Sequence, residues 1–201
     1  MKVLVVSAHP SPTSHVGILR QNLLSLLEVS GHSVRHHDLY AESFNPVFTP
    51  YERLHHVGNI QEKLHHLPEL APYVEDLQWC DTLVLVYPTW WGAQPAILKG
   101  WIDRVFMNEV AWVLPAEEAR IRPLLTNVRR LVVVTTHGSS KFINALQGES
   151  GKRIALRSIR AMFYPRVRTK WIAVYKLDTS KDSQREKKFK KVSRRLGRVF
   201  Q

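Results

Sequence analysis

Uninterrupted apolar segments recur along this chain, separated by polar, proline-containing or helix-like stretches. The segments cover residues 2–7, 82–87, 129–136 and 168–175, and a shorter, more polar one covers 33–39. Continuous runs rich in β-branched residues are typical of strands buried on both faces of a parallel sheet. The pattern therefore predicts five strands, with the 33–39 strand nearer an edge.

Between these segments the apolar residues recur every three or four positions, as in helices that cover a sheet. The first helix is expected to begin after Ser14, a favourable N-cap, and to stop at Gly31. Further helices are expected over 69–79, from 94–95 to 106, over 148–163 and from 179 to the end. Alternating strands and helices predict an α/β fold with a doubly wound parallel sheet, in one domain of residues 1–201.

Two remaining segments show no such regularity. Residues 40–68 are irregular, with room for one or two short helices, and 110–123 has the composition of a mobile, solvated crossover loop. The irregular part holds two adjacent histidine pairs, at 55–56 and 65–66. Adjacent positions on a helix point in different directions, so surface or subunit-contact histidines are favoured over a metal site.

The loop after the first strand is rich in hydroxyl groups. Ser11, Thr13 and Ser14 stand where a helix presents free backbone N–H groups, and that combination binds phosphate. An ordinary capped helix start explains the same residues equally well. The loop lacks both the Gly-rich dinucleotide fingerprint and the P-loop pattern, which points to a mononucleotide such as FMN.

Two more loops follow buried strands. The second loop, residues 88–92, reads Pro-Thr-Trp-Trp-Gly, and its indoles suit a wall for a flat ligand, although core packing or a subunit interface is the alternative. The third loop begins with Thr136 and His137, and Gly138 permits close backbone approach. His137 could donate to a ligand carbonyl or transfer a proton, or serve a structural role.

Charge and cysteine content narrow the class of protein. The net charge is +12, and nine Lys/Arg against two acids lie in 181–201. This run is either the solvated face of a terminal helix or a contact for an anionic membrane or a partner; no nucleic-acid motif accompanies it, so nucleic acid is not the expected partner. One cysteine, no long apolar run and an N-terminal run too short for a signal peptide predict a cytoplasmic protein.

These motifs closely resemble the flavodoxin-like NAD(P)H:quinone oxidoreductase family, which includes the DT-diaphorase type, the modulator-of-drug-activity type and ancillary subunits of potassium-efflux systems. The resemblance extends over roughly residues 2–165. It is carried by Ala-His-Pro at 8–10 with Ser14, Asp-Leu-Tyr at 38–40, Phe-Asn-Pro at 44–46, the long segment 87–106, and Thr-Thr-His-Gly-Ser at 135–139.

The resemblance implies a flavodoxin-like five-stranded sheet of order 2-1-3-4-5 and an enzyme that reduces quinones or similar acceptors with NAD(P)H. FMN would carry the hydride in alternating (ping-pong) steps, with FAD less expected because the chain is short. His9 would lie beside the flavin phosphate. The phosphate would be held by Ser14, His15, Val16 and Gly17, and the ring would be lined by Pro88, Thr89, Trp90, Trp91 and Gly92 and contacted at its edge by Thr136, His137, Gly138 and Ser139.

The resemblance has departures and an alternative. The diaphorase members carry a proton-relay Tyr and His where this chain has 142–150, which contains neither, and His137 stands where the family usually has Gly. His137 is therefore the one catalytic candidate. The family resemblance also implies a homodimer with the pocket at its interface, to which Tyr51 and Trp112 could contribute. The alternative function is a regulatory flavin-binding accessory subunit, for example of a potassium-efflux system, which would bind its transporter or the membrane through the basic C-terminal helix.

Overall fold

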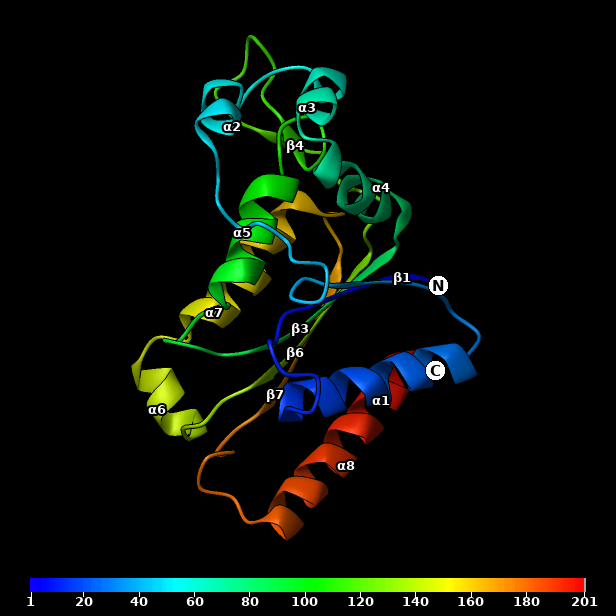
Figure 1. Cartoon of the computed structure of the whole chain (residues 1–201), viewed down its shortest axis with the longest axis vertical. Helices are drawn as coiled ribbons and strands as arrows, with labels where there is room; N and C mark the ends of the chain where they lie inside the picture. The colour runs from blue at the N-terminus through cyan, green and yellow to red at the C-terminus, as the bar shows by residue number, and fades with distance from the viewer. Residues whose placement is uncertain (201) are drawn as a thin grey trace.

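A five-stranded parallel sheet forms the centre of the computed structural model, which describes residues 1–200 (Figure 1). Its order is β2-β1-β3-β6-β7, which confirms the predicted 2-1-3-4-5 arrangement. The strands lie where the apolar runs predict them: β1(Lys2–Ser7), β2(Ser33–Asp38), β3(Thr82–Pro88), β6(Arg130–Thr136) and β7(Arg168–Val174).

The central strands β1, β3 and β6 each contribute to two apolar layers because successive side chains point to opposite faces. In β1, Val3 and Val5 pack with α1(His15–Val29) and α8(Asp182–Phe200) on one face. Leu4 and Val6 pack on the other face, which is covered by α4(Ala71–Trp79), α5(Ala96–Val105) and the helical segment that begins with α7(Ser150–Arg153) (Figure 1). Both layers are fully buried, which explains why the strands read as continuous apolar runs.

The predicted helix boundaries are confirmed where capping residues mark them. Ser14 caps α1, and its hydroxyl accepts from the Gly17 N–H at 3.0 Å. Gly31 follows the helix with a φ of +69°, in the left-handed region that glycine adopts at low cost. Pro95 stands at the N-cap of α5, where the sequence predicts that this helix begins.

Three segments differ from the expectations. Residues 148–163 form no single α-helix: α7 continues as a π-helical segment, Ile154–Ile159, and a 3-10 turn, Arg160–Met162. A short helix that the pattern does not predict, α6(Lys141–Leu146), follows the third loop. The crossover segment pairs β4(Trp112–Val113) with β5(Arg122–Pro123), and the Trp112 indole donates to the Phe106 carbonyl at 3.0 Å. Its first part is thus anchored and not a solvated loop.

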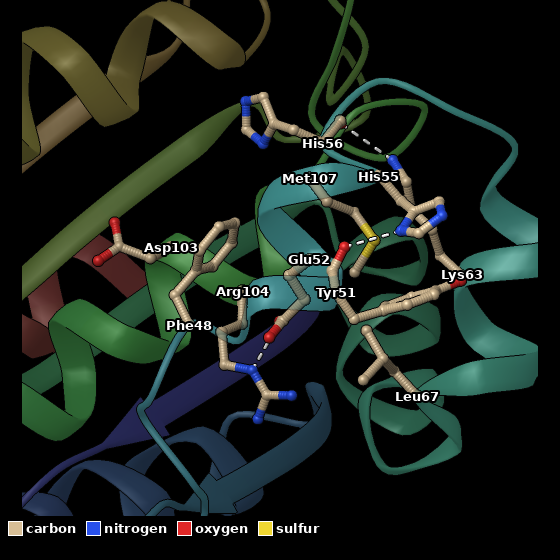
Figure 2. Close-up of a pocket in the computed structure, with 10 residues that line it drawn as sticks. All are labelled: Phe48, Tyr51, Glu52, His55, His56, Lys63, Leu67, Asp103, Arg104 and Met107. Carbon is tan, nitrogen blue, oxygen red and sulfur yellow. Dashed lines mark hydrogen bonds and ion pairs between the residues drawn. The ribbon is translucent and has the colours of Figure 1, made fainter.

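The irregular region 40–68 folds into α2(Pro50–Leu54) and α3(Ile60–His66), followed by the 3-10 turn η1(Pro68–Leu70). Arg104 of α5, almost wholly buried, ties this region to the sheet layer. Its guanidinium donates to Glu52 at 2.7 Å, to Glu69 at 2.8 Å and to the Asn45 carbonyl at 2.8 Å; Figure 2 shows the bond to Glu52. Removal of one partner would leave a buried charge uncompensated, so the cluster acts as a unit.

None of the helices within residues 1–200 has the length and apolar character needed to cross a membrane.

Candidate functional site

The loops that follow β3 and β6 meet α6 at the carboxyl ends of the strands and enclose an open cleft of about 420 Å³. Ligands of doubly wound sheets bind at this edge, where the strand order reverses. We call this space the carboxyl-edge cleft. It is lined by Thr89, Trp91, Gly92, His137, Gly138, Ser139, Asn144, Gln147 and Ser150.

The second loop turns back on itself within four residues. Trp90 and Ala93 exchange two backbone hydrogen bonds of 3.2 and 3.0 Å around Trp91 and Gly92. Both central residues have positive φ, +50° for Trp91 and +74° for Gly92, the pattern of a tight hairpin turn. The left-handed conformation is unfavourable for a bulky residue. Trp91 is nevertheless held there with its side chain fully exposed beside the cleft.

His137 is buried at the base of the cleft. Its ring stacks on Tyr175 with centroids 4.6 Å apart, its Nε2 lies 3.4 Å from the Thr89 hydroxyl, and its buried Nδ1 has no hydrogen-bond partner among residues 1–200. Burial lowers the pKa of His137, against the raising influence of Asn144 and Glu149. The imidazole is therefore neutral at neutral pH and offers one donor and one acceptor nitrogen.

Gly138 lies directly against the side chain of Asp178, on the segment after β7. A Cβ at this position would lie 2.0 Å from a carboxylate oxygen of Asp178, so the Asp178 side chain would have to move. The third loop is also tied to its neighbours: Thr89 N–H donates to the Thr136 carbonyl at 2.8 Å, and the His137 N–H donates to Val174 at 2.7 Å. These bonds extend the β3–β6–β7 ladder to the rim of the cleft.

The first loop approaches from the other side of the second. The ring centroids of His9 and Trp90 are 6.0 Å apart, and the Ser11 N–H donates to Nδ1 of His9 at 2.9 Å. Burial, with a smaller contribution from Arg20, lowers the pKa of His9, so this ring is neutral as well. Through His9, the hydroxyl-rich loop and the tryptophan loop form one continuous surface.

The start of α1 carries the donor groups expected there. No hydrogen bond within residues 1–200 uses the N–H of His15 or Val16, as is usual for the first turn of a helix. Gly17 lets the loop lie against this turn, since a Cβ there would be 2.0 Å from the Pro12 carbonyl oxygen. The Ser14 hydroxyl is occupied, because it caps the helix and donates to the Ser11 carbonyl at 2.8 Å.

The predicted residues fall into several groups. Six of them line the cleft, whereas Pro88 and Thr136 lie buried beneath it as the last residues of their strands. The positions from Ser14 to Gly17 lie at the start of α1, and His9 and Trp90 contact each other beside the cleft without lining it. The six are Thr89, Trp91, Gly92, His137, Gly138 and Ser139.

Sequence reasoning missed the far wall of the cleft. Asn144 and Gln147 come from α6 and its end, and Ser150 begins α7. The Asn144 amide donates to the Ser139 hydroxyl at 2.8 Å, which joins this wall to the third loop. The signal that could have revealed α6 is Ser140, a side-chain N-cap that accepts from the Ile143 N–H at 3.2 Å.

The histidine pairs lie elsewhere. His55 and His56 line a narrow pocket between α2, α3 and α5 (Figure 2), whereas His65 and His66 are exposed at the end of α3. His55 stacks on Tyr51 with centroids 4.1 Å apart, and His56 lies 5.2 Å from Trp112. Across the part of the chain that the structure describes, no three His, Cys, Asp or Glu side chains converge as metal ligands would. These histidines are packed in aromatic contacts.

The comparison with known proteins agrees with this architecture. The model of a protein family described as having a flavodoxin-like fold matches residues 1–198. The chain belongs to this flavodoxin-like family. The sequence-based recognition is thereby confirmed, and relatives of the chain are named NAD(P)H:quinone oxidoreductases.

Individual proteins are also similar to this flavodoxin-like chain in sequence or in structure. A ribosyldihydronicotinamide dehydrogenase [quinone] of Pongo abelii is 32% identical over 152 residues, 70% of this chain and 65% of the relative. The structure of Smu.1420 from Streptococcus mutans is 27% identical with a TM-score of 0.79, over 98% of this chain and 100% of that one. An FMN-dependent NADH-azoreductase from Bacillus anthracis, solved with FMN, shares the fold at 13% identity, with a TM-score of 0.78 over 99% of both chains. The first curated relatives are matched over only 44 to 65% of their own length.

The residues of this flavodoxin-like chain fit a flavin mononucleotide. A phosphate needs donors that are not already used, and the first turn of α1 offers two backbone amides at the positive end of a 15-residue helix. A flat ring needs apolar surface, and the exposed Trp91 indole supplies it. Polar ring edges need directed donors or acceptors, and Nδ1 of His137, which has no partner within residues 1–200, can act as one or the other according to its tautomer.

Proposed function

We propose that this chain is an FMN-dependent NAD(P)H oxidoreductase that reduces quinones or similar acceptors, with residues 1–201 as one flavin-binding domain. One observation carries the proposal. Free helix amides, an exposed indole held in a strained turn and a buried neutral histidine all lie at the carboxyl edge of one sheet. The names of the quinone reductase relatives support it, as does the azoreductase with FMN.

The phosphate end of FMN is assigned to the first loop. The N–H groups of His15 and Val16 would donate to the phosphate, while Ser14 holds the turn and Gly17 keeps the loop close. The one acidic side chain of α1, Glu28, lies in its last turn, so nothing on this helix opposes an anion at its start. The neutral His9, beside Trp90, lies between this end and the tryptophan loop.

The ring of the flavin is assigned to the carboxyl-edge cleft. The chemistry that FMN would supply here is two-electron transfer from NAD(P)H to a quinone, which takes up two protons, and the two substrates would use the pocket in turn. Trp90, Trp91 and Gly92 would form one wall and exclude water from it. Thr89 and the residues from Thr136 to Ser139 would orient the ring edge.

His137 is assigned as the catalytic candidate. Because its pKa is lowered by burial, the ring is neutral and can hold a hydrogen bond through Nδ1 without adding a charge. The Tyr175 stack and the Thr89 hydroxyl fix the ring orientation. No Tyr or His lies within 142–150, so His137 would contact the flavin ring edge without the relay of the diaphorases.

We also propose that the active form is a homodimer. Phe142 and Leu146 of α6 are exposed by 71 and 72%, next to a cleft that already exposes Trp91. Apolar surface gathered at one rim is typical of an interaction site. Tyr51 and Trp112 line none of this chain's own cleft, so they could complete a flavin pocket only from the partner.

The basic C-terminal helix supports a second candidate role, that of a regulatory flavin-binding subunit. Lys187, Lys191 and Arg194 of α8 are exposed, while its apolar stripe packs on the sheet. Such a face could hold a cytoplasmic protein at an anionic membrane or at a transporter. Flavin retained without useful turnover, together with salt-sensitive binding to anionic vesicles, would favour this role over the reductase.

FMN binding and the absorbance of the bound flavin test the proposed reductase activity. Purified protein is expected to bind FMN, and the flavin absorbance should bleach anaerobically when NADH or NADPH is added. A quinone added next should restore the absorbance. Protein that takes up no added FMN, or flavin that neither nicotinamide reduces, would contradict the proposal.

A further inference from the structure

We propose that the amino edge of the sheet holds a second binding pocket, for a small anion with two or more adjacent phosphate groups. Its lining encloses about 590 Å³ and includes four arginines. Because β3 is seven residues long, this pocket lies roughly 20 Å from the carboxyl-edge cleft. We call it the arginine pocket; its lining residues are Met1, Asp81, Thr82, Arg129, Arg130, Tyr164, Arg166 and Arg168.

Strand pairing brings the four arginines together from two separate segments. Arg130 is the register partner of Arg168 at the start of β6 and β7. The Arg168 N–H donates to the Arg129 carbonyl at 2.9 Å, and Arg129 N–H donates to Asp81 at 2.8 Å. The backbone beneath the pocket is therefore fixed by the sheet, so Arg166, two residues before Arg168, is held at the same rim.

Within residues 1–200, positive charge exceeds negative charge in the lining of this pocket. In the described residues none of the four guanidinium groups forms an ion pair with a carboxylate. Asp81, the acid in the lining, already accepts from the Lys2 N–H at 2.9 Å and from the Thr82 hydroxyl at 2.7 Å. Four like charges around one cavity repel each other, and an anion would relieve that repulsion.

The other contacts of these arginines position them without satisfying their charge. The Arg129 guanidinium lies 5.3 Å from the ring centroid of Tyr164. Arg130 donates to the Val199 carbonyl at the end of α8 and lies against the Met1 sulfur. Figure 1 shows the chain start and the end of α8 on this same side of the sheet. Two guanidiniums are thus oriented, while Arg166 and Arg168 are exposed at the rim.

The shape and the donor type select the ligand. Guanidinium presents paired N–H donors that match the oxygens of phosphate, and two or more such groups suit adjacent phosphates better than one. The basic residues of α8, in contrast, lie on a convex helix where Lys190 already pairs with Glu186 at 2.7 Å. A cavity admits a small anion, whereas a membrane or a nucleic acid needs a flat or extended basic surface.

Binding of tripolyphosphate, measured by calorimetry on the flavin-loaded full chain, tests the inference. One saturating site per chain is expected, with inorganic phosphate bound at least about tenfold more weakly because it reaches fewer guanidiniums. The double variant R166Q/R168Q should weaken tripolyphosphate binding at least about tenfold. The matched control K187Q/K191Q removes the same charge from α8 and should change the affinity less than about twofold, because exposed charges are screened.

Three outcomes would overturn the inference. They are the absence of saturable tripolyphosphate binding, an equal loss in both double variants, and binding to vesicles containing phosphatidylinositol bisphosphate or to single-stranded RNA without binding to free tripolyphosphate. Circular dichroism of each variant checks folding. If R166Q/R168Q fails to fold, R168Q alone must give a several-fold weakening. Reduction of bound flavin is expected to be unchanged in R166Q/R168Q, which separates this pocket from the proposed reductase site.

Discussion

The two ends of the same sheet recognise ligands by different means. At the carboxyl edge, the polar groups are backbone N–H groups, hydroxyls, side-chain amides and neutral histidines, and Gly17 permits a close backbone contact that a Cβ would block. At the amino edge, four arginines with permanent charges line the arginine pocket. One end is therefore built on shape and dipoles, the other on charge.

This difference follows from the direction of the strands. Helices of a doubly wound sheet begin at the carboxyl edge, so their N–H ends supply partial positive charge there without any charged side chain. The amino edge receives helix C-terminal ends, such as that of α8, and a positive surface there must come from side chains. The two sites should therefore differ in how strongly steric and ionic changes affect them.

The largest expected effect comes from Gly17→Ala. Its Cβ would lie 2.0 Å from a backbone oxygen, so the first loop must shift, which costs about 1–3 kcal/mol of stability and weakens FMN binding about 10- to 100-fold. Equilibrium unfolding and FMN titration measure both. Gly58→Ala is the control, because its nearest neighbours are 3.8 Å away. An unchanged FMN affinity in Gly17→Ala would show that the first loop does not contribute to FMN binding.

The next largest difference is expected in the salt dependence of ligand affinity at the two edges of the sheet. Raising the salt concentration from about 50 to about 200 mM is expected to weaken tripolyphosphate binding by about tenfold, because several exposed charges are screened. FMN affinity should fall less than about threefold, since only its phosphate is charged and it meets helix amides. Parallel calorimetric titrations give both values. Equal salt dependence at the two sites would contradict the division between dipoles and charge.

Trp91 offers a smaller and more specific effect. Trp91→Gly removes the unfavourable left-handed conformation, so stability should stay equal or rise by up to about 1 kcal/mol, while quinone reduction falls several-fold. Trp91→Ala removes the ring but keeps the strain, and it separates the two contributions. Thermal unfolding and steady-state rates are the measurements. If Trp91→Gly destabilises the fold substantially, the indole serves packing and not ligand contact.

The smallest effect concerns pH. The pKa of folded His137 lies below its ordinary value of 6.5. Just below pH 6.5, the unfolded chain therefore binds a proton at His137 that the folded chain does not bind. The stability that this group contributes is present above pH 6.5 and is lost as pH falls through the folded pKa. Urea unfolding at pH 7.5 and 5.5, without added flavin, should show a smaller acid loss for His137→Gln than for the wild type. The exposed His65→Gln is the control, and equal losses in all three proteins would show that His137 is not held neutral.

The sheet and the three loops could be predicted because their information is local. Doubly buried strands appear as continuous apolar runs, and loops at their carboxyl ends must meet once the strand order is known. Ser14 could be recognised as a cap for the same reason. The positions at the start of α1 and in the tryptophan loop therefore lie where the motif places them.

The remaining features depend on contacts between distant segments. A helix as short as α6, whose apolar side chains Phe142 and Leu146 are exposed, shows no amphipathic pattern to detect. The left-handed Trp91 could not be foreseen, because bulky residues avoid that conformation. Arg129 and Arg168 are far apart in sequence and become neighbours only through the β6–β7 pairing. The arginine pocket is thus invisible in the sequence.

The most direct test is an FMN titration, monitored by flavin fluorescence, of three proteins: the wild type, Gly17→Ala and R166Q/R168Q. The carboxyl-edge site predicts saturation at one FMN per chain in the wild type, the same affinity in R166Q/R168Q, and a loss of about 10-fold or more in Gly17→Ala. Absence of FMN binding in the wild type, or a loss in R166Q/R168Q that equals the loss in Gly17→Ala, would contradict a flavin site at the carboxyl edge.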